Sequence, residues 1–339
     1  MINFWLSQAN WCKNFFPLAE TAKNQGLDCN INLIESNKWN TCFSKENFNI
    51  ISSFCEKNKI KLSINNHSSG DIDFFIEGNH RNNSNAKKKV IITENSVFSM
   101  HLQDKKALPR YYDSYIADVD HVIFSAKIFA KKYDCLNSKN LYHGVPQFDT
   151  SYKLSKKDII SLLHLESLQN KKIVVIILPK LRDAPKVDFI KLYAVLRSLD
   201  FCIFTKTRGK DVYANKFILG DYHFNDFTTY RSWSPYTTSL LLQISNLAIN
   251  FGSTATIECI ANKTPYIDFK IKEYESFDFL NEKSVSHVMH SALNYENSTL
   301  VDNIIRLLNI KEHTFNILHE KLELPVHDKI CKNILNSLL

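Results

Sequence analysis

Glycine and proline are scarce in this chain of 339 residues, which has 7 glycines and 8 prolines. Collagen-like and low-complexity sequences need far more of both, so these classes are excluded. Long apolar runs are also missing, since no segment reaches the roughly eighteen residues of a membrane-spanning helix. The first residues, MINFWLSQANW, carry no basic leader and only a short apolar run, and we expect neither a signal peptide nor an anchor.

Several familiar catalytic motifs are absent as well. The chain has no G-x-S-x-G, no G-x-x-x-x-G-K-[ST] and no G-x-G-x-x-G, which removes the main support for a hydrolase, a P-loop enzyme and a dinucleotide-binding enzyme. Its 12 histidines show no metal-ligand spacing, and we predict no metal site. The 8 cysteines form no C-x-x-C pair, and we interpret them as reduced core residues of a cytoplasmic protein.

The charge is mildly basic and evenly spread. The formal net charge is +7; residues 1–150 carry 18 basic and 15 acidic side chains, and the remainder carries 24 and 20. Nucleic-acid-binding proteins concentrate Lys and Arg on one face or tail, so we expect no nucleic-acid partner. An even excess suits anionic small ligands and an acidic membrane surface equally well, and peripheral association with the inner face of a membrane stays open.

What the sequence does contain is a regular alternation of short apolar runs and amphipathic segments, which is typical of an α/β protein with mostly parallel sheets. Its length suffices for two domains of about 150 residues each. The first half predicts a Rossmann-like domain. Its predicted strands span residues 2–6, 29–34, 60–64, 72–76, 90–93 and 121–124, and its predicted helices lie near residues 11–26 and 45–58.

A polar segment with Gly144 and Pro146 interrupts the alternation over residues 140–158 and is the best candidate for a domain boundary. Beyond it we predict strands at residues 172–178, 201–205, 247–250 and 265–269, helices near 187–198 and 236–244 and from Ser253, and an all-helical end from residue 299. The predicted domains are therefore residues 1–145 and 146–320, followed by a C-terminal helix over 321–339. A return of this helix to the first domain is left open.

The segment NFGSTATIECIANKTPYIDF, residues 250–269, has the strand-turn-helix form that places ligands beyond the carboxyl ends of parallel strands. Gly252 lets the chain turn tightly, while Ser253 and Thr254 can cap the following helix and present amides and hydroxyls to an anion. Glu258 lies about 7.5 Å further along such a helix. A phosphate at the cap and ribose hydroxyls at Glu258 fit this spacing, and an ordinary Ser cap with a solvated Glu fits it equally.

Two further polar clusters follow neighbouring predicted strands. ILPKLRDAP places Lys180 and Arg182 after the most strand-like run of the chain, and FTKTRGKD places Lys206 and Arg208 at the end of the next strand. Because the carboxyl ends of parallel strands share one edge, these cations could converge with Ser253 on a phosphate. Each cluster taken alone is equally typical of a solvated loop.

The segment SLLLQISNLAINFGSTATIECIANKTPYIDF, residues 239–269, resembles the C-terminal motif of the GT-B superfamily. The similar branch contains UDP-N-acetylglucosamine 2-epimerases, CDP-glycerol glycerophosphotransferases and capsule or surface-polysaccharide glycosyltransferases. The shared features are a Leu-rich helix, SN before a strand, a turn of small and hydroxyl residues, a Glu in the next helix, and K-x-P before a final strand. LYHGVPQFD and VVIILPKLRD resemble an interdomain segment and a strand end of the same proteins, and the resemblance covers residues 140–270.

The resemblance implies two Rossmann-like domains facing a cleft, with a nucleotide sugar held by the second. It implies donor phosphates at Ser253 and Thr254, ribose at Glu258, and further phosphate contacts at Lys180, Arg182 and Lys206. Gly252 and Arg208 are added to the predicted donor site because they lie in the same turn and the same strand-end cluster. The chain also departs from these relatives. The epimerases carry an Asp-Ser-Gly-Gly turn where this chain has Asn-Phe-Gly-Ser from Asn250, and the phosphotransferases end a strand with Lys-x-His-Pro where this chain has no histidine. Epimerase activity is therefore not expected.

A transferase that inverts its sugar needs a base for the acceptor hydroxyl. The first half offers Asp73, Glu77 and Glu94 at predicted strand ends, with His101 nearby. We prefer Glu94 because it follows the run VIIT directly, although an acid that merely caps the next helix fits equally. His143 in the boundary segment could contact the donor or simply stabilise a turn.

Together with these patterns, the resemblance implies a GT-B glycosyltransferase that acts without a metal and uses a nucleotide sugar as a substrate, with no resident cofactor. The similar proteins lean toward inversion of the sugar, which is the outcome we expect. The expected acceptor is a surface or capsule-type glycan, free or lipid-linked. A CDP-polyol phosphotransferase is the alternative enzyme. A binding protein that keeps the fold without catalysis is the alternative of a different class, and Asn250 and Phe251 in place of an acidic turn favour it.

Overall fold

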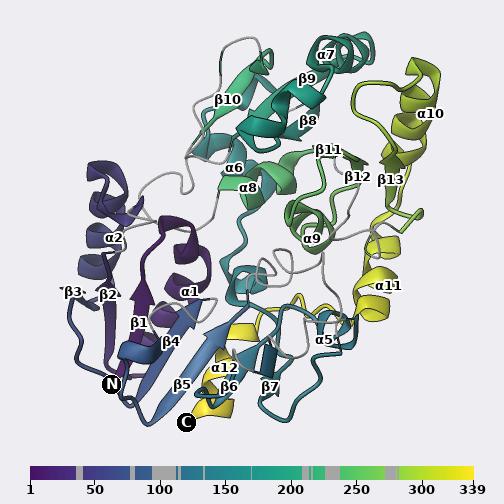
Figure 1. The fold of residues 1–339 in the computed structure, drawn as a ribbon. Helices are drawn as coiled ribbons and strands as arrows, with labels where there is room; N and C mark the ends of the chain where they lie inside the picture. Colours follow the sequence, from purple (N-terminus) through teal and green to yellow (C-terminus); the bar gives the residue numbers. More distant parts are fainter. Residues whose placement is uncertain are drawn as a thin grey trace. The chain divides into compact units, whose positions relative to one another are not determined.

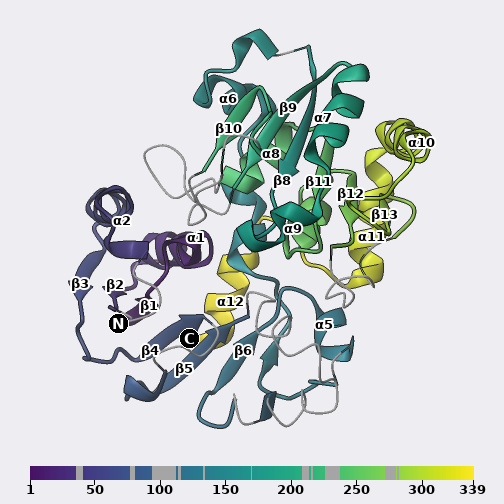
Figure 2. The same cartoon turned by 45° about the horizontal axis from the view of Figure 1, so that its top comes forward.

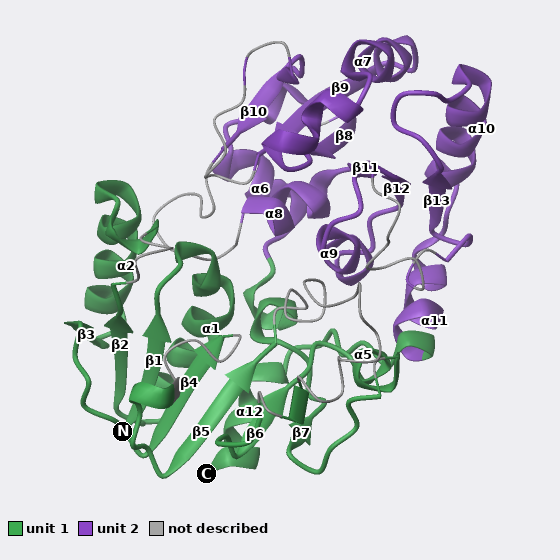
Figure 3. Ribbon diagram, viewed as in Figure 1, with its two compact units in different colours: residues 1–153, 228–235, 321–339 green, residues 154–227, 236–320 purple. Residues whose placement is uncertain are grey.

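The structure is a computed structural model of the chain (Figure 1). It describes residues 1–35, 41–76, 81–93, 112–113, 116–132, 134–168, 170–207, 214, 217–225, 237–271, 280 and 282–339. These residues form two compact units (Figure 3). The first unit contains residues 1–153 and 321–339, and the second contains the described residues between 154 and 320. Each unit is built on its own parallel sheet.

The first unit has a seven-stranded sheet with the order β3-β2-β1-β4-β5-β6-β7. Its strands are β1 (Ile2–Leu6), β2 (Cys29–Leu33), β3 (Lys61–Ile64), β4 (Ile72–Ile76), β5 (Lys88–Ile92), β6 (His121–Ile123) and β7 (Asn140–Leu141). Its helices include α1 (Cys12–Asn24), α2 (Lys45–Lys57) and α5 (Lys127–Lys132). Every residue of β1, β2 and β4 is buried, as expected for parallel strands covered on both faces.

Aromatic side chains of α1 join the sheet to the helices of the first unit. The ring of Phe15 lies 5.5 Å from that of Phe4 on β1, and the ring of Phe16 stacks on that of Phe54 in α2 at 4.0 Å. Helix α1 stops where Gly26 takes a positive φ of 78°, a conformation that costs glycine little. The amphipathic pattern of residues 11–26 and the glycine that follows it therefore determine both the buried face and the end of this helix.

The second unit has a six-stranded sheet with the order β10-β9-β8-β11-β12-β13, which can be followed in Figures 1 and 2. Its strands are β8 (Lys172–Ile177), β9 (Phe201–Lys206), β10 (Tyr222–Phe224), β11 (Leu247–Asn250), β12 (Tyr266–Phe269) and β13 (Ser286–Met289). Its helices include α6 (Lys156–Leu162), α7 (Phe189–Ser198), α8 (Thr237–Ile244), α9 (Ala255–Ala261) and α10 (Asn297–Leu308). Helix α11 (Glu312–Leu322) belongs to this unit up to Glu320.

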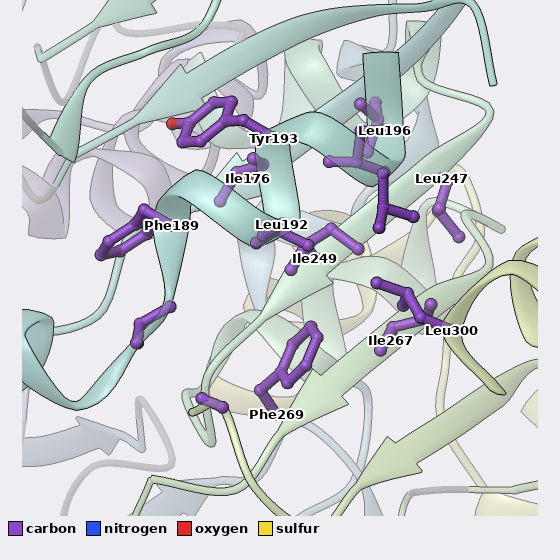
Figure 4. Packing of buried hydrophobic residues seen from close by; sticks show 14 of the residues in the cluster. Ile176, Phe189, Leu192, Tyr193, Leu196, Leu247, Ile249, Ile267, Phe269 and Leu300 are labelled. Atoms are coloured by element: carbon purple, nitrogen blue, oxygen red, sulfur yellow. The ribbon is translucent and has the colours of Figure 1, made fainter. Parts of the chain in front are cut away.

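One face of this second sheet packs on α7 and α10. The contact is a cluster of buried aliphatic and aromatic side chains, with Ile176, Ile249 and Ile267 from three neighbouring strands, Leu192 from α7 and Leu300 from α10 (Figure 4). Helices α8 and α9 contact strands of the same sheet. Since side chains alternate along a strand, the residues between the members of the cluster point to the opposite face.

The last helix, α12 (Ile330–Leu338), belongs to the first unit and packs against α1. Asp149 accepts a hydrogen bond from the backbone N–H of Cys331 in its first turn at 2.8 Å. The carbonyl oxygen of His327 accepts one from the N–H of Thr150 at 3.0 Å. At the other end, Lys88 donates from Nζ to the carbonyl oxygen of Leu338.

The prediction of two Rossmann-like sheets is confirmed, and each predicted strand is present to within two residues at either end. Three short strands, β7, β10 and β13, were not predicted. All 8 cysteines are buried free thiols, in agreement with their interpretation as core residues. Among the helices that the structure describes, none is long and apolar enough to cross a membrane.

Candidate functional site

Polar side chains occupy one row at the carboxyl edge of the second sheet. Asn250 on β11 pairs with Asp268 on β12, and Lys206 on β9 pairs with Ile177 on β8. Because Ile176 pairs with Ile249, Ile177 is level with Asn250, and all four residues stand in the same row. Alternation places their side chains on the face opposite the α7–α10 cluster.

The remaining side chains on this face of the four strands are apolar or aromatic. Val175, Phe204, Ala248 and Tyr266 precede the polar row and are fully buried. The exposed fractions of Lys206, Asn250 and Asp268 are 2%, 0% and 4%, so the row is also out of water. Burying polar and charged groups costs free energy unless they are bonded, which makes such a row at the edge of an apolar sheet a candidate functional site.

The turn of residues 251–254 leads out of this row. Gly252 has a φ of +60°, and a Cβ placed on it would meet no atom within 4 Å. Its backbone N–H donates to Asp268 Oδ1 at 2.7 Å. The glycine therefore serves the tight turn that the sequence predicted, and its own amide is held by the neighbouring strand.

Asn250 fixes the rest of the turn with both ends of its amide. Its Oδ1 accepts from Ser253 Oγ at 2.7 Å, and its Nδ2 donates to Thr256 Oγ1 at 2.9 Å. Ser253 Oγ also accepts from the N–H of Ala255, the first residue of α9, at 3.2 Å, while Thr254, the residue directly before the helix, makes no side-chain capping bond. In the part of the chain that the structure describes, the backbone N–H groups of Ser253 and Thr254 have no hydrogen bond, and both residues are half-buried.

Glu258 is a buried residue of α9, with 8% of its surface exposed. All residues of this helix are buried, so the alternative of a solvated Glu is wrong. Burial raises the pKa of the Cys259 thiol well above its usual value, and the nearby carboxylates of Glu258 and Asp268 raise it further. Both carboxylates thus lie in the same low-dielectric interior, beside the turn.

The predicted cations fall into two groups. Lys206 is buried, and its Nζ donates to the carbonyl oxygen of Thr207. Lys180 and Arg182 are exposed; Arg182 keeps 71% of its side-chain surface in solvent, and its Nε lies 3.9 Å from Asp183 Oδ2. Lys180 and Arg182 follow β8, which pairs with β11, and Lys206 ends β9 on the other side of β8, so their backbones share the carboxyl edge of one sheet. Arg208 lies outside the described residues.

Of the candidates in the first unit, the structure describes His143 and Asp73. His143 is half-buried in the first unit, where its Nε2 lies 2.8 Å from Ser337 Oγ on α12. Asp73 is the second residue of β4, at the amino edge of its sheet, and it accepts hydrogen bonds from Gly70 N–H and Ser84 Oγ. Its assignment as a strand-end base is therefore wrong, because the strand begins one residue earlier. Three other candidates, Glu77, Glu94 and His101, lie outside the described residues.

Sequence reasoning missed the part that Asn250 and Asp268 play in the turn. An Asn and an Asp near the ends of two consecutive predicted strands were a usable signal. Because parallel strands that follow each other through one helix are usually neighbours, these two polar residues were candidates for one row.

No protein-family model matches the sequence, and none of the curated proteins does. Solved structures do match the fold over nearly the whole chain. A putative UDP-N-acetylglucosamine 2-epimerase from Listeria monocytogenes has a TM-score of 0.64 at 10% identity and covers 99% of this chain and 95% of its own.

Two other solved structures contain ligands or were treated with them. Alr3699/HepE of Anabaena, in complex with UDP and glucose, has a TM-score of 0.57 at 12% identity and covers 100% of this chain and 99% of its own. The wall teichoic acid polymerase TagF, soaked with CDPG, has a TM-score of 0.59 at 12% identity and covers 99% and 87%. At these identities the likeness establishes the fold.

Proposed function

The chain has the GT-B fold, and from this premise we propose that it is a glycosyltransferase. It transfers a sugar from a nucleotide-sugar donor to a surface or capsule-type glycan, free or lipid-linked. The enzyme acts in the cytoplasm, in peripheral contact with the inner membrane face when the acceptor is lipid-linked. It has no resident cofactor.

The observation that carries this proposal is the buried polar row at the carboxyl edge of the second sheet. Ligands of open parallel sheets bind at this edge, and here Lys206, Asn250 and Asp268 interrupt an apolar face beside the buried Glu258. A merely structural sheet would continue its apolar side chains to the last row. The fold is also shared with a protein solved in complex with UDP and glucose.

In the proposed complex the donor phosphates lie over the turn of residues 251–254. The N–H groups of Ser253 and Thr254 donate to phosphate oxygens, and Gly252, whose Cβ position is open, lets them come close. The cationic side chains of Lys180, Arg182, Lys206 and Arg208 supply positive charge. Glu258 accepts hydrogen bonds from the ribose hydroxyls.

The proposed reaction is a direct displacement at the sugar. The acceptor oxygen forms a bond to the anomeric carbon of the sugar, the bond from that carbon to the phosphate oxygen breaks, and the nucleoside diphosphate leaves with the electron pair. Backbone amides and cations stabilise the growing negative charge, so the proposal needs no metal. Glu94 is the proposed base that takes the acceptor proton, and attack opposite the leaving group inverts the sugar.

A CDP-polyol phosphotransferase is a second candidate, because TagF matches the fold as well as the glycosyltransferase-related structures do. In that reaction the acceptor oxygen attacks phosphorus, and CMP leaves in place of a nucleoside diphosphate. The same phosphate and ribose contacts serve both donors. A non-catalytic protein would keep the fold and bind neither of these donors.

Nucleotide binding by the full chain tests the proposal. Isothermal titration with UDP, GDP, CDP and CMP, followed by UDP-sugars and CDP-glycerol, identifies the donor class. The variant Glu258→Gln keeps the size of the side chain and loses its charge, so affinity for the preferred nucleotide should fall about 10- to 100-fold, the worth of one or two charge-assisted hydrogen bonds.

Glu320→Gln is the matched control, since Glu320 is an exposed acid of α11 in the same unit. This variant should bind as the wild type does. If the wild type binds none of the nucleotides, the protein is not a donor-using transferase. If Glu258→Gln binds as tightly as the wild type, Glu258 does not hold the ribose.

A further inference from the structure

We propose that Asp268 is a positioning residue of the donor site, which fixes the turn of residues 251–254 so that its outward amides receive the diphosphate of a nucleotide. The inference rests on the proposed function and adds to it a residue that does not touch the donor. It concerns the second unit alone.

The turn is held from two different strands. Asn250 on β11 bonds to Ser253 and Thr256, which lie after the turn's glycine. Asp268 on β12 reaches the glycine itself and accepts its N–H at 2.7 Å. Asn250 and Asp268 pair with each other across the two strands. The two side chains therefore clamp the turn at its start and at its end.

Gly252 needs a hydrogen bond from outside the turn to fix its backbone conformation. Nothing lies within 4 Å of its Cβ position, and glycine has more backbone freedom than any other residue. Without the bond to Asp268, the peptide before Gly252 could rotate and carry the following N–H groups of Ser253 and Thr254 with it. A diphosphate that needs two amides at once would then meet them only part of the time.

The charge of Asp268 also argues for positioning over contact. A carboxylate beside an anionic ligand repels it, so a direct contact with phosphate would weaken binding. Asp268 is only 4% exposed and points one oxygen at a backbone N–H.

The test compares three variants of the full chain with UDP as the probe. Asp268→Ala removes the acceptor, Asp268→Ser leaves a hydroxyl too short to reach Gly252, and Asp268→Asn keeps an acceptor oxygen at the same distance without charge. We expect UDP affinity to fall at least about 10-fold for the Ala and Ser variants and to stay within about threefold for the Asn variant. Hydrogen exchange of a peptide over residues 250–256 should quicken in the first two only.

Asp221→Ala is the matched control. Asp221 Oδ2 accepts from the N–H of Ile203 at 2.7 Å, the same kind of bond, but it stands before β10 at the opposite edge of the same sheet. This variant should lose stability without losing UDP affinity.

The outcomes separate the two proposals. Quicker exchange at residues 250–256 with unchanged UDP affinity overturns the positioning role and leaves the proposed function intact. A large loss in Asp268→Asn also overturns it, because the charge would then be what matters. If the wild type binds no nucleotide, the proposed function fails, and this inference fails with it.

Discussion

Gly252 combines a left-handed backbone with open space around the position of a Cβ. Gly26, which follows α1 in the first unit, has the same two properties, with a φ of +78°. The two glycines differ in what surrounds them in the proposed complex, since only Gly252 lies under the donor. The same substitution at both glycines therefore separates the cost of backbone strain from an effect on ligand binding.

We predict that Gly252→Ala and Gly26→Ala each destabilise the protein by about 1 to 2 kcal/mol, the cost of a left-handed residue with a Cβ. Only Gly252→Ala should weaken UDP binding, by about 10-fold or more, because its methyl group would stand where the phosphate approaches. Urea denaturation and isothermal titration measure the two effects. Equal UDP affinity in both variants would mean that no ligand comes close to Gly252.

At the residue scale, the sequence predicted the parts of the site that belong to a local pattern. The tight turn at Gly252 follows from strand-turn-helix spacing and has the expected left-handed backbone, and Ser253 bonds to the first amide of α9; their role in donor binding stays a prediction. The burial of Glu258 was left open, because burial of a helix face depends on what packs over it. The bond between Asp268 and Gly252 joins residues 16 apart, and it exists only once β11 and β12 are side by side.

At the element scale, α12 depends on a cap that comes from far away in the chain. Asp149 accepts from Cys331 N–H at 2.8 Å and from the N–H and hydroxyl of Ser151 at 3.1 and 2.6 Å. It is 4% exposed. The capping residue and its helix are 182 residues apart in sequence, so the segment after β7 and the last helix are fastened together.

We predict that Asp149→Ala destabilises the first unit by about 2 to 3 kcal/mol, since it removes a helix cap and leaves buried donors unpaired. Asp149→Asn should recover more than half of the loss, because an amide oxygen can still accept. The measurement is the urea midpoint, read from the reactivity of the buried Cys331 thiol.

Ser155→Ala provides the comparison for a local, exposed cap. Ser155 Oγ accepts from Asp158 N–H at 3.1 Å at the start of α6 in the second unit. It should cost only about 1 kcal/mol and leave Cys331 protected. If Asp149→Ala were as mild as this control, the distant cap would not hold α12.

Elements with a clear period were predictable, whereas the short strands β7 and β10 were not. The run KIVVIIL and the amphipathic residues 45–58 gave β8 and α2 with nearly correct ends. Strand β7 has two residues and β10 has three. Such strands form because a neighbouring strand offers its edge, and their own sequence shows too few alternations to reveal a period.

At the scale of the whole molecule, the chain builds two sheets with separate cores, and residues 321–339 belong to the same unit as residues 1–153. Units with separate cores need not unfold in one step, so a single melting temperature would mix them. The buried cysteines offer a reporter for each: Cys12 is 1% exposed on α1, and Cys259 is 0% exposed on α9. A short pulse of thiol labelling in urea therefore follows each unit.

Each unit also contains a histidine whose pKa the fold lowers. Burial lowers the pKa of His143 in the first unit, and nearby His327 lowers it further. Burial also lowers the pKa of His287 in the second unit, together with Arg306, His290 and Lys283. The unfolded chain then binds more protons than the folded one below the usual histidine pKa of about 6.5. Stability is complete above that pH and falls as the pH drops towards the lowered folded value.

We predict that both units become less stable to urea when the pH is lowered from about 7.5 to about 5.5, the range in which histidine titrates. The urea midpoint should fall when it is followed by labelling of Cys12 in the first unit and of Cys259 in the second. His143→Gln should reduce the acid effect at Cys12 and leave that at Cys259 unchanged, and His287→Gln should do the reverse. His313→Gln, an exposed position of α11, is the substitution control.

The carboxylate of Asp71 does not interfere in this pH range. Hydrogen bonds from Lys87 and from the N-terminal amine lower its pKa to about 2, so its stabilisation is lost only in stronger acid. If the urea midpoint followed at Cys12 still falls in acid in the His143→Gln variant, the proton-sensitive group of the first unit is another residue.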